Sequence, residues 1–161
     1  MIVQFLHLSS YGILFGAQVF QTFINGIVAF KALGRPYFGV HQAAIFPVYF
    51  SLQSFLPVLV GLTSTTSLEN GLNWKSGRVM GAVTVTGLIN LVVFRPLTQG
   101  AVRAKNAQEL RDKRRGGDGP SKELVARNSR FMVIHASSIL INVIGLLATV
   151  HYGIGLGMRL S

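Results

Sequence analysis

Residues 131–158 read FMVIHASSILINVIGLLATVHYGIGLGM, a stretch of 28 residues without a charged side chain. A helix rises about 1.5 Å per residue and needs about 20 apolar residues to cross a bilayer. Further charge-free stretches of 30, 33 and 16 residues lie at 1–30, 36–68 and 79–94. The last is short, but Arg78 and Arg95 at its ends carry long side chains that reach the headgroups. The sequence therefore predicts four membrane spans, near residues 4–29, 40–64, 76–96 and 131–156.

The composition excludes an ordinary soluble domain. Only 12% of the 161 residues are charged and 50% are hydrophobic, whereas soluble domains carry about 25% charged residues. The chain has no cysteine, so disulfides and thiolate chemistry are also excluded. We predict an all-α, polytopic integral membrane protein, a four-helix transmembrane bundle forming a single membrane domain over residues 1–161.

The basic residues predict the orientation of the bundle. Ten of the fifteen Lys and Arg residues lie at 95–130, and Lys31 and Arg35 lie between the first two spans. Lys75, Arg78 and Arg159 fall on the other side. The positive-inside rule then places both basic connections in the cytosol and both termini on the non-cytosolic side.

The linker at 97–130 is the longest polar segment. Its first part favours a helix that continues the third span, Gly116 and its neighbours break that helix, and Ser121 with Glu123 predicts a new start. The basic cluster Arg111, Lys113, Arg114 and Arg115 either determines topology alone or contacts anionic lipid headgroups. Nucleic acid is excluded as a partner because no aromatic residues alternate with these charges.

Polar residues line one face of two spans. They recur at alternating steps of three and four residues, the spacing of a single helix face. In the first span this seam contains His7, Tyr11, Gln18, Gln21 and Asn25, and in the fourth it contains His135, Ser138, Asn142, Thr149 and Tyr152. The third span adds Asn90.

We expect the two polar faces to pack together, because lipid offers such groups no hydrogen-bond partner. An antiparallel pairing would place Gln18 by Asn142, Gln21 and Asn25 by His135 and Ser138, and His7 and Tyr11 by Thr149 and Tyr152. The seam then either holds the helices together or forms a path for a small solute or ion.

No pattern predicts catalysis, a cofactor or a metal site. The sequence lacks a nucleophile elbow, a phosphate-binding loop and an HExxH pair. Four histidines, two expected near each membrane face, are too few ligands per face for a metal without Cys or carboxylate partners.

Glycine and proline are expected to shape the spans. The pairs Gly12/Gly16 and Gly77/Gly81 have the spacing that allows close helix approach. Pro47 and Pro57 predict kinks in the second span. Gly153, Gly155 and Gly157 predict fraying at the end of the fourth helix.

The chain resembles the transmembrane protein 205-like family over nearly its whole length. The resemblance is carried by His7-Leu8, Gly16-Ala17-Gln18, Thr22-Phe23, Phe38-Gly39, Phe46-Pro47-Val48-Tyr49-Phe50, Asn90, Pro96-Leu97-Thr98, Arg130-Phe131 and residues 135–142. Arg95 departs from it, because animal members are expected to carry Glu before the proline. The resemblance implies four spans, cytosolic loops, and the family positions His7, Gln18, Pro47, Tyr49, Asn90, Pro96, His135 and Asn142.

Together these patterns predict a non-enzymatic membrane protein of structural, accessory or trafficking type. It would act through membrane partners, in a larger membrane complex or as a homo-oligomer. The alternative is a small exporter or channel that moves a solute or metal ion along the polar seam. The resemblance implies the endoplasmic reticulum or another membrane of the secretory pathway.

Overall fold

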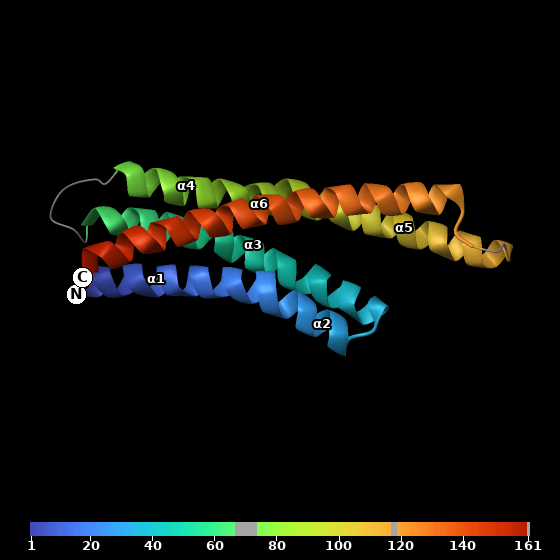
Figure 1. Cartoon of the computed structure of the whole chain (residues 1–161), viewed down its shortest axis with the longest axis horizontal. Helices are drawn as coiled ribbons and strands as arrows, with labels where there is room; N and C mark the ends of the chain where they lie inside the picture. Colours follow the sequence, from blue (N-terminus) through green and yellow to red (C-terminus); the bar gives the residue numbers. More distant parts are fainter. Residues whose placement is uncertain (67–73, 117–118, 161) are drawn as a thin grey trace.

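The computed structural model describes residues 1–66, 74–116 and 119–160, and all regular structure in them is helical. The elements form four rods (Figure 1). They are α1 (Ile2–Val19), η1 (Phe20–Asn25) and α2 (Gly26–Ala32); α3 (Arg35–Thr66); α4 (Trp74–Ile89), η2 (Asn90–Phe94) and α5 (Arg95–Arg115); and α6 (Lys122–Leu160). Each rod contains a helix long and apolar enough to cross a membrane, which confirms the predicted all-α, four-span fold.

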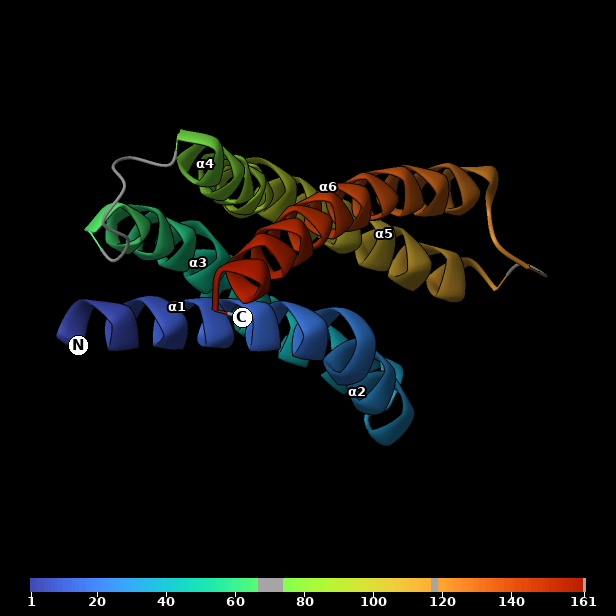
Figure 2. The same ribbon diagram turned by 60° about the vertical axis from the view of Figure 1, so that its left-hand side comes forward.

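The rods run alternately up and down the molecule. In Figure 1 both termini lie at one end, called here the terminal end, and the turn into α6 lies at the other, called the linker end. The α1 rod lies along α3, α3 lies beside α4, and α5 pairs with α6. Figure 2 shows α6 crossing α1 obliquely. The side chains of Arg35, Lys75 and Arg159, used above to predict orientation, are outside the described part.

Helix ends at the linker follow local chemistry. α5 ends where Gly116 takes a left-handed φ of 67°, a conformation that favours glycine. The Ser121 Oγ atom accepts the backbone N–H of Leu124 at 3.1 Å and caps α6. The predicted break and restart are therefore confirmed, as is the continuation of the third rod through α5.

The outer surface of the bundle is apolar and the interior is small. Large hydrophobic side chains such as Phe23, Leu62 and Val133 are 58%, 64% and 66% exposed. An apolar cluster inside the terminal half contains Leu14, Leu56, Val60, Met80, Val83 and Tyr152. This outward distribution of apolar side chains is what contact with a lipid bilayer requires.

The glycines at which helices approach closely are not the ones that the sequence predicts. Among the described residues, a Cβ atom built on Gly12, Gly16, Gly77 or Gly81 meets nothing within 4 Å, so the predicted close helix contacts at these glycines are wrong. Close approach occurs instead at Gly87, Gly145 and Gly153. The predicted fraying is also wrong, because α6 continues to Leu160; Gly153 lies against the Tyr11 side chain within the packed bundle.

Candidate functional site: the buried polar seam

The seam begins at the terminal end with a three-helix cluster around His7. The His7 Nδ1 atom lies 2.8 Å from the Thr63 Oγ1 of α3, and its Nε2 lies 3.0 Å from the Tyr152 hydroxyl of α6. Tyr11 packs on the ring of Tyr152 with centroids 5.8 Å apart. The expected proximity of His7 and Tyr11 to Tyr152 is confirmed, and the cluster joins α1, α3 and α6.

Asn142 forms the centre of the seam. Its Oδ1 accepts the Tyr49 hydroxyl at 2.6 Å, and its Nδ2 donates to the Thr22 Oγ1 at 3.1 Å. The amide therefore links α6 to α3 and to the π-helical turn η1. The predicted pairing of Gln18 with Asn142 is wrong, because Asn142 uses Tyr49 and Thr22 instead.

Toward the linker end the two predicted polar faces diverge. Asn25 donates to Gln21 of its own turn at 2.9 Å, and its Oδ1 lies 3.1 Å from the His41 Nε2 of α3. Ser138 donates to the Asn90 Oδ1 at 2.7 Å. The expectation that Gln21 and Asn25 meet His135 and Ser138 is therefore wrong. The physical reason is the oblique crossing of α6, which carries its linker half toward α5 rather than along α1 (Figure 2).

His135 takes part in an aromatic contact. Its ring stacks on Phe131 one turn earlier, with centroids 5.5 Å apart and planes inclined by 9°. Among residues 1–66, 74–116 and 119–160, no group of three His, Asp or Glu side chains is placed to share a metal ion.

Three amide side chains that are fully buried have polar atoms without a partner in the described residues. Both amide atoms of Gln18 and of Gln53, and the Nδ2 of Asn90, are unpaired. Their side chains are 0%, 1% and 0% exposed. Buried polar groups in this state normally bind an ordered water or another polar guest. These amides are therefore the part of the seam whose hydrogen-bonding groups are left unsatisfied by the protein.

Gln53 lies where three helices meet. A Cβ atom on Gly145 of α6 would lie 2.9 Å from the Gln53 Nε2, and one on Gly87 of α4 would lie 2.9 Å from the Gln53 carbonyl carbon. Pro57 has no N–H, so the Gln53 carbonyl receives no helix hydrogen bond from it. α3 continues as a helix through Pro47 and Pro57.

Sequence reasoning missed Gln53, Thr63 and Thr22. The spacing rule that found the seam in the first and fourth spans also selects Gln42, Tyr49, Gln53 and Thr63 when it is applied to the second span. Thr22 lies outside the rule because the π-helical turn η1 shifts the facing direction of its residues.

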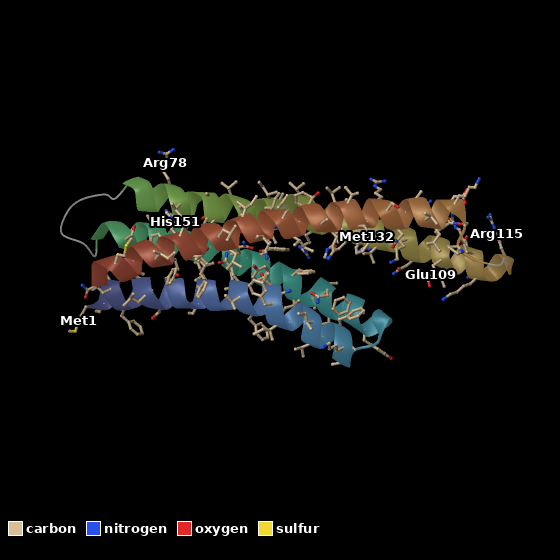
Figure 3. All side chains as sticks on the ribbon, viewed as in Figure 1. Met1, Arg78, Glu109, Arg115, Met132 and His151 are labelled. Carbon is tan, nitrogen blue, oxygen red and sulfur yellow. The ribbon has the colours of Figure 1, made fainter. Side chains whose placement is uncertain are left out.

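The predicted lipid-contact residues lie far from the seam. Arg111, Lys113, Arg114 and Arg115 belong to the last turns of α5, where Lys113 pairs with Glu109 at 3.3 Å. In Figure 3 Glu109 and Arg115 lie at the opposite end of the molecule from Met1. All four side chains are exposed.

Comparison with known proteins identifies relatives of the chain. It is 34% identical over 158 residues to "Xanthocillin biosynthesis cluster protein D" of Aspergillus fumigatus, covering 96% of this chain and 88% of that protein. No solved structure matches. Residues 9–107, from α1 into α5, match the family described as "Domain of unknown function (DUF4149)". The polar-cored helical bundle described above therefore belongs to the DUF4149 family.

Proposed function

We propose that the protein is a non-enzymatic membrane accessory protein that acts through other membrane proteins. The observation that carries this proposal is the set of hydrogen bonds across the seam. His7, Asn142, Asn90 and Asn25 each form a hydrogen bond to a rod other than their own, so these four side chains and their partners join all four rods. Groups engaged in this way support a scaffold rather than a reaction centre.

The related fungal protein supports a place beside a biosynthetic pathway. Its name assigns it to a biosynthesis cluster and states no reaction, which is consistent with an accessory role for this chain. The resemblance to the transmembrane protein 205-like family supports a role in trafficking, and a location in the endoplasmic reticulum or another secretory membrane.

The proposed orientation places the linker end in the cytosol. Lys31 lies in the last turn of α2, and Lys113, Arg114 and Arg115 lie in the last turn of α5, at the end opposite the termini. A basic excess at one end of a bundle favours the cytosolic side.

Native mass spectrometry of the protein, extracted in mild detergent from its own membrane at native expression, tests the accessory role. We expect a complex with a different membrane protein at fixed stoichiometry. A monomer, or only a homo-oligomer, under conditions that preserve a known membrane complex of the same preparation contradicts the proposal.

A second candidate function is transport of a small polar solute. The unpaired amides of Gln18 and Gln53 favour it, because their polar atoms are free to hydrogen-bond a small polar molecule inside the bundle. The test is solute flux into proteoliposomes. Loss of flux in Gln18→Ala and Gln53→Ala, with unchanged yield of folded protein, supports transport, whereas flux equal to that of empty vesicles contradicts it.

A further inference from the structure

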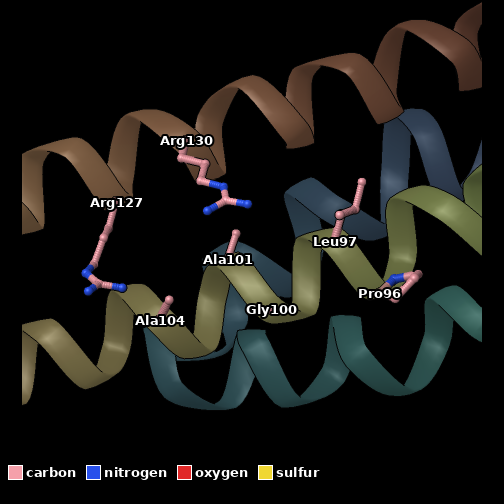
Figure 4. A pocket seen from close by; sticks show the side chains of 7 residues that line it. All are labelled: Pro96, Leu97, Gly100, Ala101, Ala104, Arg127 and Arg130. Carbon is pink, nitrogen blue, oxygen red and sulfur yellow. The ribbon is translucent and has the colours of Figure 1, made fainter.

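A pocket of about 240 Å³ lies between α5 and α6, away from the seam. Its lining from α5 is small and apolar, and its lining from α6 is basic (Figure 4). The residues that matter here are Leu97, Gly100, Ala101 and Ala104 on α5, and Arg127 and Arg130 on α6. The absence of bulk at Gly100 and the two alanines leaves room beside the arginines for a ligand.

Both guanidinium groups point across the pocket. In Figure 4 Arg127 reaches to the level of Ala104, and Arg130 reaches to the level of Ala101. Within the described part of the chain, neither forms an ion pair with a carboxylate. A guanidinium group binds a phosphate through paired hydrogen bonds, so each of the two arginines offers such a group to a phosphate in the pocket.

The charges around the pocket favour an anion. Arg95, Arg103 and Lys105 of α5 lie on the same stretch of the molecule, and Lys105 lies 5.2 Å from the centroid of the Phe131 ring on α6. Glu123 is the acidic residue on the facing helix, and it lies one turn before Arg127. Basic residues outnumber carboxylates along this stretch of α5 and α6, even with Glu109 counted beside Glu123, and this excess gives the pocket a positive potential.

The position of the pocket at the membrane boundary favours a lipid over a soluble anion as its ligand. Arg130 directly precedes the charge-free stretch at 131–158, so it lies at the boundary of the hydrocarbon layer. Beside it Leu97, Met132 and Val133 are 44%, 54% and 66% exposed, and they continue the apolar outer surface. A molecule with its phosphate on the arginines would lay its acyl chains along this surface.

We infer that this pocket binds the phosphate of an anionic phospholipid, held by Arg127 and Arg130. Basic pockets between helices at the membrane surface are known to hold such headgroups. This site differs from the exposed cluster Arg111, Lys113, Arg114 and Arg115, none of which lines this pocket. The inference is independent of the proposed function, because it holds whether or not the protein has membrane partners.

The test is native mass spectrometry of the purified full chain, delipidated and then incubated with equal amounts of phosphatidic acid and phosphatidylcholine. We expect one phosphatidic acid molecule to be retained in preference to phosphatidylcholine. Arg127→Gln and Arg130→Gln should each weaken its retention about fivefold. Gly100→Leu should weaken it as well without changing charge, because its Cβ meets nothing within 4 Å and the longer side chain fills the pocket.

The matched control is the double variant Lys31→Gln with Arg78→Gln, which removes two exposed positive charges on α2 and α4, elements that do not line the pocket. We expect it to retain phosphatidic acid like the wild type. An equal loss of phosphatidic acid retention in this control, or no loss of retention in the pocket variants, overturns the proposed binding site. Binding of inorganic phosphate as tight as that of the lipid overturns the lipid assignment. Thermal melting confirms folding of each variant, and Ala104→Leu replaces Gly100→Leu if the latter does not fold.

Discussion

Asn142 forms hydrogen bonds to two residues that lie far from it in the sequence and belong to two other rods. It bonds Tyr49, 93 residues away, and Thr22, 120 residues away. Hydrogen bonds between membrane helices contribute about 0.6 kcal/mol each on average and up to about 1.7. Their effect here lies as much in fixing which helices meet as in stability.

We therefore predict that Asn142→Ala lowers the free energy of unfolding in detergent by about 1 to 2 kcal/mol. Tyr49→Phe should lower it less, and the double variant should lose less than the sum of the two. Ser137→Ala is the control, because Ser137 is partly exposed and its hydroxyl bonds only the Val133 carbonyl of its own helix. An equal decrease in the free energy of unfolding for Asn142→Ala and Ser137→Ala would show that the buried hydrogen bonds of Asn142 do not stabilise the bundle.

Gly87 permits the contact between α3 and α4. A Cβ atom there would lie 2.8 Å from the Ser54 Oγ and 2.9 Å from two α3 backbone atoms. We predict that Gly87→Ala costs about 1 to 3 kcal/mol by overpacking. Gly81→Ala on the same helix should be neutral or stabilising, because its Cβ meets nothing within 4 Å. Thermal unfolding of the two variants gives the comparison, and equal melting temperatures would be inconsistent with this packing.

Among the secondary-structure elements, the connection between α5 and α6 is stabilised by three hydrogen bonds around Asp112 and Ser121. Asp112 accepts Gln108 Nε2 at 2.9 Å and the backbone N–H of Ser121 at 3.1 Å, while Ser121 caps α6. Loss of an N-cap side chain costs about 1 kcal/mol.

We predict that Ser121→Ala and Asp112→Ala increase hydrogen exchange in residues 105–128 without changing exchange in the spans. Glu109→Ala serves as the control, because its exposed pair with Lys113 contributes little. Hydrogen exchange that rises across the whole bundle would contradict a local role for these hydrogen bonds.

The elements themselves follow from the sequence, whereas their crossing angles do not. Charge-free length predicts the four rods, and Gly116 with Ser121 predicts the break before α6, because these signals are local. The partner of Asn142 depends on the oblique path of α6 and on the turn η1, which no local spacing specifies. For the same reason the glycines at which helices approach, Gly87 and Gly145, lie outside the motif that suggested Gly12 and Gly77.

At the scale of the whole molecule, the even number of spans places both termini at one end of the bundle. The proposed orientation makes the linker end cytosolic. The chain has no cysteine, so single cysteines report the side of the membrane directly. We predict that Gly34→Cys and Pro120→Cys react with an impermeant thiol reagent only from the cytosolic side, and Ile2→Cys only from the other. Labelling of Gly34→Cys and Ile2→Cys from the same side contradicts the topology.

If the seam joins helices and does not conduct solute, its interior is closed to water-soluble reagents. This is tested by labelling of Gln18→Cys and Gln53→Cys in sealed proteoliposomes with a small, water-soluble thiol reagent, with Pro120→Cys as the reactive reference. We expect neither interior cysteine to react from either side during the time in which Pro120→Cys reacts completely. Rapid labelling of both interior cysteines in folded protein would reveal a water-filled path and contradict this expectation.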